Sequence, residues 1–145
     1  MSNPNSIIES FDVAQFEVNI EGLQAKNFTS IHGLGMNTES LPVQEGAMHE
    51  KVSRKGRTRY RNLELVRLFT GNKELVSWFQ ECARKAPVKR SGSVILKGEN
   101  SEELFRFNFR KAWPIEWVGP SFEAHGVNQP AYERLVLDVE ELEVV

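Results

Sequence analysis

The sequence has little of the chemistry on which most catalytic and metal sites depend. Its 145 residues include one cysteine and three histidines, so an internal disulfide is excluded and zinc-type Cys/His spacing is absent. No Walker A, GxGxxG or GxSxG sequence occurs, and His32, His49 and His125 lie far apart without a companion ligand at helical spacing. We therefore predict a protein that is not an enzyme and that holds no metal or cofactor.

Segments that would direct the chain to a membrane are also lacking. The amino terminus, MSNPNSIIES, has neither the basic nor the apolar region of a signal peptide, and no uncharged apolar run approaches the roughly 18 residues of a membrane span. The net charge is only -2, so the total charge indicates no nucleic-acid or membrane partner. The length and the 40% hydrophobic content predict one domain, residues 1–145, made in the cytosol and soluble there.

Most of the sequence shows patterns that are typical of β-strands. Apolar and polar residues alternate through QFEVNIEG, which begins at Gln15 and stops at Gly22, as in a half-buried strand. The same alternation runs through ELFRFNFRKAW, with Phe105, Phe107 and Phe109 on one face. Further strands are predicted in NFTSIHGLG, ESLPVQEG, YRNLELVRLF, GSVILKG and YERLVLDVEELEVV.

One segment, NKELVSWFQECARKA, has the period of an amphipathic helix. Its apolar residues recur at spacings of three and four, Asn72 can cap its start, and Pro87 ends it. Cys82 falls on the apolar stripe, so we interpret it as a packing residue. Together the elements predict a mainly β (α+β) fold, an antiparallel β-barrel or sandwich of about six or seven strands with one flanking α-helix.

Between these elements, residues 46–60 show no clear pattern. The segment GAMHEKVSRKGRTRY has scattered polar residues, few large apolar ones and a central Gly56. We predict a long loop or extended arm here, and loops of this length in compact domains are usually functional.

Charge is separated along the chain. Residues 51–61, KVSRKGRTRYR, contain six basic residues and no acid, whereas the terminal YERLVLDVEELEVV is strongly acidic. Opposite patches on one molecule favour head-to-tail self-association into a ring or filament. The alternative is a small monomeric β-domain that binds nucleic acid or another polyanion through residues 51–61, with Tyr60 as a stacking surface.

The ordered set of segments resembles a known family. FEVNIEG, FTSIHGL, VQEG, the basic segment, YRNLEL, ELVSWF, FRFNFRKAWPIEW and AYERLVLDVEEL follow one another as in the tail tube proteins of contractile phages and phage-tail-like injection systems, which are relatives of the type VI secretion tube protein. The resemblance covers roughly residues 13 to 142. Its most specific part is the aromatic strand that runs into Ala112-Trp113-Pro114, with Trp117 after it.

This resemblance implies a structural subunit. Six copies would form a ring whose inner strands join into one β-barrel, and rings would stack into a hollow tube that a contractile sheath drives through a target envelope. The implied partners are other copies of the chain, the sheath protein, baseplate and tube-initiator proteins, and cargo in the lumen, without membrane insertion of the monomer. The implied location is a virion tail or a phage-tail-like particle that is released from the cell.

Two groups of residues are candidates for this assembly. We hypothesise that the basic segment contacts acidic groups on a neighbouring subunit. The residues of this subunit interface are Lys51, Arg54, Lys55, Arg57 and Arg59 on one side and Asp138, Glu140 and Glu141 on the other.

The second group is the AWPIEW segment. Proline donates no backbone hydrogen bond, so we expect strand pairing to end at Trp113-Pro114. Trp113 and Trp117 would then pack as core residues over the end of the barrel, between sheet and helix, and fix the turn into the last strand.

Overall fold

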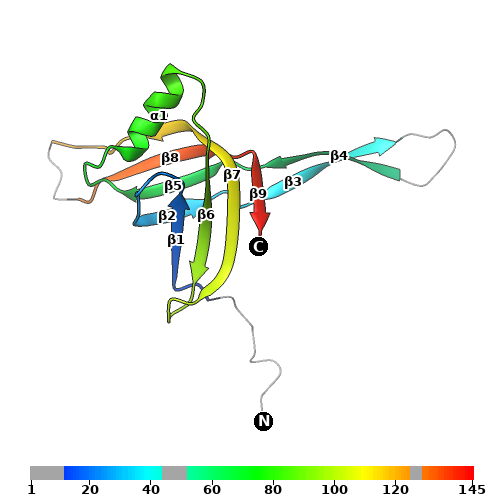
Figure 1. Ribbon diagram of the computed structural model, residues 1–145, viewed down its shortest axis with the longest axis horizontal. Coiled ribbons are helices and arrows are strands. Elements are labelled where there is room, and N and C mark those ends of the chain that lie inside the picture. Colours follow the sequence, from blue (N-terminus) through cyan, green and yellow to red (C-terminus); the bar gives the residue numbers. More distant parts are fainter. Residues whose placement is uncertain (1–11, 44–51, 125–128) are drawn as a thin grey trace, which may run out of the picture.

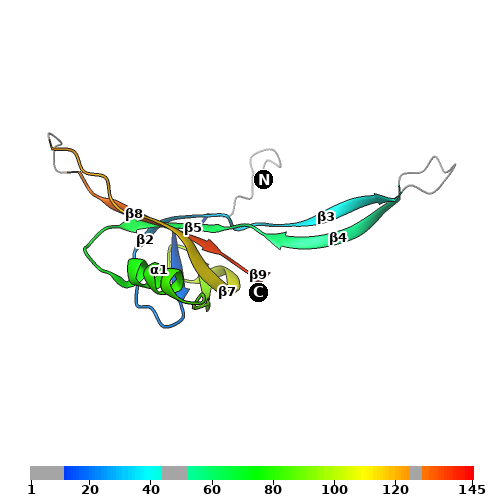
Figure 2. The ribbon, with the colours of Figure 1, turned by 90° about the horizontal axis from the view of Figure 1, so that it is seen from above.

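The computed structural model describes residues 12–43, 52–124 and 129–145. These residues form one seven-stranded sheet, a separate two-stranded sheet and one helix (Figures 1 and 2). The elements are β1 (Gln15–Ile20), β2 (Phe28–His32), β3 (Met36–Val43), β4 (Val52–Tyr60), β5 (Leu63–Leu68), α1 (Glu74–Arg84), β6 (Arg90–Lys97), β7 (Glu103–Val118), β8 (Tyr132–Asp138) and β9 (Glu141–Val144). All strand pairs are antiparallel, which confirms the predicted mainly β fold with one flanking helix.

The large sheet has the order β1-β6-β7-β8-β5-β2, and β9 also pairs with β7. The first half of β7 lies between β6 and β9, whereas its second half pairs with β8. The change of partner occurs around Lys111, which has a positive φ of 51°. A residue in this conformation bends a strand, and β7 curves from one layer of the molecule into the other (Figure 1).

The hydrophobic core lies on one face of the curved sheet, between its two layers. Apolar side chains alternate inward on the strands of both layers, so each layer presents one apolar face. The core consists of Val18, Ile20, Ala25, Phe28, Leu63, Leu65, Leu75, Trp78, Cys82, Val94, Phe109, Ala112, Leu135, Leu137, Val139 and Leu142.

Helix α1 covers one end of this core. The side-chain Oδ1 of Asn72 accepts a 2.8 Å hydrogen bond from the backbone N–H of Glu74, which satisfies one free donor at the start of the helix. Leu75, Trp78 and Cys82 are buried on its inner face. The packing role predicted for Cys82 is therefore confirmed.

Two predicted elements differ from the structure. The terminal YERLVLDVEELEVV was expected to be one strand, but it forms β8 and β9, which pair with different halves of β7. The reason is that β8 follows β7 into one layer, and the chain then turns back at Glu140 to pair in the other layer. Strand pairing also does not end at Trp113-Pro114, because β7 continues to Val118.

Of the two forms predicted for residues 46–60, a long loop or an extended arm, residues 52–60 take the second. They form β4, which pairs with β3 along its whole length in the two-stranded sheet, here called the arm (β3 and β4). The remainder of the predicted loop, 46–51, lies outside the described residues. Periodicity failed here because an alternating apolar pattern arises only when one face of a strand is buried, and no residue of either arm strand is fully buried.

Candidate assembly surfaces and a buried polar network

The arm projects far beyond the body of the protein, roughly in line with β2 and β5 (Figures 1 and 2). Among the described elements, its substantial contacts are those between its own two strands. The hydroxyl groups of Thr38 and Thr58 are hydrogen-bonded across the pair at 2.8 Å. An isolated two-stranded ribbon is only marginally stable in water, so we expect another molecule to pack against an arm of this length.

Four of the predicted interface cations lie on the arm. Arg54, Lys55, Arg57 and Arg59 belong to β4 and are exposed, whereas Lys51 lies outside the described residues. The described part of the arm holds one acid, Glu39. Within the described residues, no ion pair of 4 Å or less involves any of the four cations, so their charges are uncompensated.

The predicted acidic partners lie at the junction of β8 and β9. Asp138 ends β8 and is half-buried, and Glu140 forms a 3.5 Å ion pair with Lys89. Glu141 lies 3.8 Å from Arg110, which also pairs with Glu143 at 3.2 Å. The acidic junction is defined as Asp138, Glu140, Glu141 and Glu143, and the last three share two cations, Lys89 and Arg110. Within the described residues, no ion pair joins these acids to the arm of the same chain.

The tryptophans of AWPIEW are half-buried and pack against the core. Trp113 and Pro114 lie opposite Asp138 and Leu137 of β8. The register shifts just after Pro114, and β8 is the partner strand of this half of β7. A proline is tolerated at such an irregular edge because its missing N–H interrupts no second ladder.

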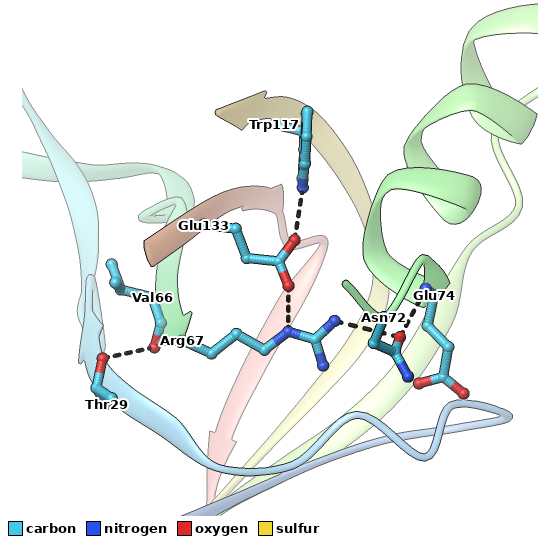
Figure 3. Close-up of polar contacts among 7 residues, drawn as sticks. All are labelled: Thr29, Val66, Arg67, Asn72, Glu74, Trp117 and Glu133. Carbon is cyan, nitrogen blue, oxygen red and sulfur yellow. Dashed lines mark hydrogen bonds and ion pairs between the residues drawn. The ribbon is translucent and has the colours of Figure 1, made fainter. Parts of the chain in front are cut away.

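Trp117 also belongs to a polar network that the sequence interpretation missed (Figure 3). Its indole N–H donates a 3.0 Å hydrogen bond to Glu133, whose carboxylate also forms an ion pair with Arg67. Arg67 and Glu133 are 5% and 1% exposed and lie directly opposite each other on β5 and β8. The Arg67 guanidinium donates a further, longer bond of 3.4 Å to Asn72, which links the ion pair to the start of α1.

The alternation of apolar and polar residues in β5 and β8 contained a signal for this buried network. In YERLVLD, Glu133 falls on the same face as the buried Leu135 and Leu137. In LELVRL, Arg67 shares a face with Leu63 and Leu65. Charged residues at two core positions of neighbouring strands indicate a buried pair, since a single buried charge is too costly to keep.

Neither a metal site nor a membrane helix stands out in the described part of the chain. No group of three or more His, Cys, Asp or Glu side chains there is placed to hold a metal ion. His32 ends β2, and His49 and His125 lie outside the described residues. The helix that the structure describes is too short and too polar to span a bilayer.

The sequence from residue 13 to residue 143 matches the family described as T4-like virus tail tube protein gp19. This match spans most of the chain, including the arm, both layers of the sheet and the helix. The chain belongs to the tail tube protein family. The resemblance predicted from the ordered segments is thereby confirmed, and the polyanion-binding alternative gains no support. Among curated proteins, none matches the sequence.

Solved structures share the tail tube fold at low sequence identity. A chain of the extracellular contractile injection system PVC sheath-tube complex in the extended state has a TM-score of 0.82 and 21% identity, with 100% of this chain and 99% of that chain covered. A chain of the anti-feeding prophage tube terminating cap has a TM-score of 0.82 and 22% identity, with 100% and 99% covered. Hcp1 from Flavobacterium johnsoniae has a TM-score of 0.55 and 16% identity, with 89% and 93% covered.

Proposed function

We propose that this tail tube protein is the repeating subunit of the inner tube of a contractile injection apparatus. Six copies form a ring, rings stack into a hollow tube, and a sheath around the tube drives it through a target envelope. The family match carries this proposal. It is supported by the full-length likeness to chains of a sheath-tube complex and of an anti-feeding prophage baseplate.

The partners that follow are other copies of the chain, the sheath protein, and the baseplate and tube-initiator proteins. Sheath-tube, tube-terminator and baseplate assemblies are the sources of the similar chains, which supports this set. The role is structural, and the particle is a virion tail or an extracellular phage-tail-like particle.

Sheet edges provide a physical reason for self-assembly. β1 and β2 are the end strands of the large sheet, so each has one edge without a partner among the described strands. Such edges are prone to pair with other chains, and closure of several subunits into one barrel removes them. The arm adds a second contact element, because none of its four described cations forms an ion pair with an acid of the described residues, and all four are exposed.

For the contact itself we propose that the arm cations meet acidic groups of a neighbouring subunit. Lys51, Arg54, Lys55, Arg57 and Arg59 are the cations and Asp138, Glu140 and Glu141 the acids. One exposed ion pair contributes only about 0 to 1 kcal/mol, but repetition around a ring and along a tube multiplies the effect.

Negative-stain electron microscopy tests the proposal, with light scattering after size exclusion on the same sample. The purified protein is examined across a concentration series, alone and mixed with its sheath protein. Six-fold rings or hollow tubes are expected. A monodisperse monomer under every condition would contradict it.

A further inference from the structure

The pairing of β3 with β4 contains one register shift, and this shift determines which side chains of β4 lie on each face of the arm. Thr38 lies opposite Thr58, and Ser40 lies opposite Lys55, so three steps along β4 match two along β3. Glu39 therefore faces both Gly56 and Arg57, which is a β-bulge. The bulge requires glycine, because a Cβ at position 56 would lie 2.8 Å from the Cβ of Glu39.

The bulge brings two arginines to one face. Arg54 and Arg59 are five residues apart, so in a regular strand they would point to opposite faces. Their partners on the regular strand β3 are Leu41 and Asn37, which are four residues apart and share a face. Side chains of directly opposed residues lie on the same side of a sheet, so Arg54 and Arg59 share that face as well.

The two faces of the arm consequently differ in chemistry. One face, here called the arginine face, carries Asn37, Glu39, Leu41, Val43, Val52, Arg54 and Arg59. The other, here called the hydroxyl face, carries Met36, Thr38, Ser40, Pro42, Ser53, Lys55, Thr58 and Tyr60. Only the arginine face combines a pair of arginines with an opposed pair of aliphatic side chains near the tip.

The arginine face has the features of an interface that lacks its partner. Leu41 is 43% exposed and Val52 is 44% exposed, next to Arg54, whose charge is uncompensated within the described residues. Apolar side chains beside arginine are typical of protein contacts. On the hydroxyl face, Thr38 and Thr58 already satisfy each other across the strands.

We propose that the arginine face is the side of the arm that contacts a second copy of this chain, and that it lies on the acidic junction of that copy. This inference rests on the proposed tube function. In the acidic junction, three of the four acids share two cations, Lys89 and Arg110, and Val144, 45% exposed, ends β9 next to Glu143. Its excess negative charge and exposed aliphatic surface complement the arginine face.

Two changes that lower the net charge by the same two units separate the faces. Arg54→Glu changes the arginine face, and Ser40→Glu/Ser53→Glu is the control on the hydroxyl face, where both serines are exposed. Assembly is measured as the pelleted fraction and tube length at a fixed concentration, with circular dichroism of the unassembled protein as the check of folding. We expect Arg54→Glu to lower assembly by about tenfold or more and Ser40→Glu/Ser53→Glu to change it by less than about twofold.

A charge exchange tests the receiving surface. The variant Arg54→Glu/Arg59→Glu is combined in one chain with Glu140→Lys/Glu141→Lys, and we expect each double variant to lose assembly and the combined variant to recover it. Equal effects of Arg54→Glu and Ser40→Glu/Ser53→Glu, or no recovery on combination, would overturn the inference. Tubes of the unmodified protein would then still leave the proposed function intact. Absence of tubes from the unmodified protein would overturn both.

Discussion

Trp117 donates its indole N–H to a carboxylate that is 1% exposed, that of Glu133, at 3.0 Å. The same carboxylate pairs with Arg67 across the β5–β8 ladder. The aromatic segment therefore closes a polar network as well as packing on the core. One carboxylate connects strands β5, β8 and the second half of β7, which are neighbours in one layer of the sheet (Figure 3).

Removal of one member of the Arg67–Glu133 ion pair should lower the free energy of unfolding more than removal of both members. Glu133→Leu leaves the Arg67 guanidinium buried without its counter-charge, and we expect a loss of about 3–5 kcal/mol in the free energy of unfolding. Arg67→Met/Glu133→Leu removes both charges and should lose less, with a remaining cost of about 1–3 kcal/mol from the unpaired Trp117 N–H. Urea unfolding followed by circular dichroism measures all three proteins. Equal losses for the single and double variants would contradict a buried pair.

The two tryptophans of AWPIEW allow a matched comparison. Trp117→Phe keeps an aromatic ring but removes the donor to Glu133, so we expect a loss of about 1–3 kcal/mol in unfolding free energy. Trp113→Phe is the control, because the Trp113 indole makes no hydrogen bond within the described residues. It should lose less than Trp117→Phe, and the reverse order would show that packing, not the hydrogen bond, decides the role of Trp117.

Much of the fold could be predicted because burial leaves a pattern in the sequence. The alternation in YERLVLD and the three- and four-residue spacing in α1 both arise from one face packed on a core. The family resemblance depended on the same segments. The prediction that failed depended on a contact between distant segments. Strand pairing of β7 was expected to end at Trp113-Pro114, but β7 continues because it pairs with β8, which lies further along the chain.

The arm could not be predicted as paired strands for the opposite reason. Both of its faces are open to solvent in the single chain, so selection for a partner surface, not for a core, sets its composition. Its basic residues were recognised as an interface hypothesis. Their distribution between two faces was beyond sequence reasoning, because it depends on a bulge that is visible only in the register of β3 with β4.

A pH dependence follows from the pair that joins β1 and β6. The Nζ of Lys97 lies 2.6 Å from a carboxylate oxygen of Glu17, and this hydrogen bond lowers the pKa of Glu17 from its ordinary value of 4.5. A lowered pKa in the folded state contributes stability that is complete above pH 4.5 and is lost as the pH falls through the folded value. Glu17→Gln should therefore destabilise the protein near neutral pH and have little effect in strong acid.

Denaturant unfolding of both proteins across the acid range measures this difference. Lys97→Met removes the same pair from the other side and should show the same convergence with the unmodified protein at low pH. A constant difference between Glu17→Gln and the unmodified protein across the range would mean that the Glu17 side chain acts through packing and not through its charge.

Insertion of one serine between Glu39 and Ser40 tests the arm bulge without any change of charge. The insertion supplies β3 with the residue that it lacks opposite the bulge, so the β3–β4 ladder becomes regular. Arg54 and Arg59, which are five residues apart, then point to opposite faces while every cation of the arm is retained. We expect the body to keep its thermal unfolding temperature within about 2 °C, because the arm's substantial contacts in the described structure are internal to it. Tube assembly should fall by at least as much as with Arg54→Glu. Normal tubes from the insertion variant would mean that the number of positive charges on the arm matters and their placement on one face does not.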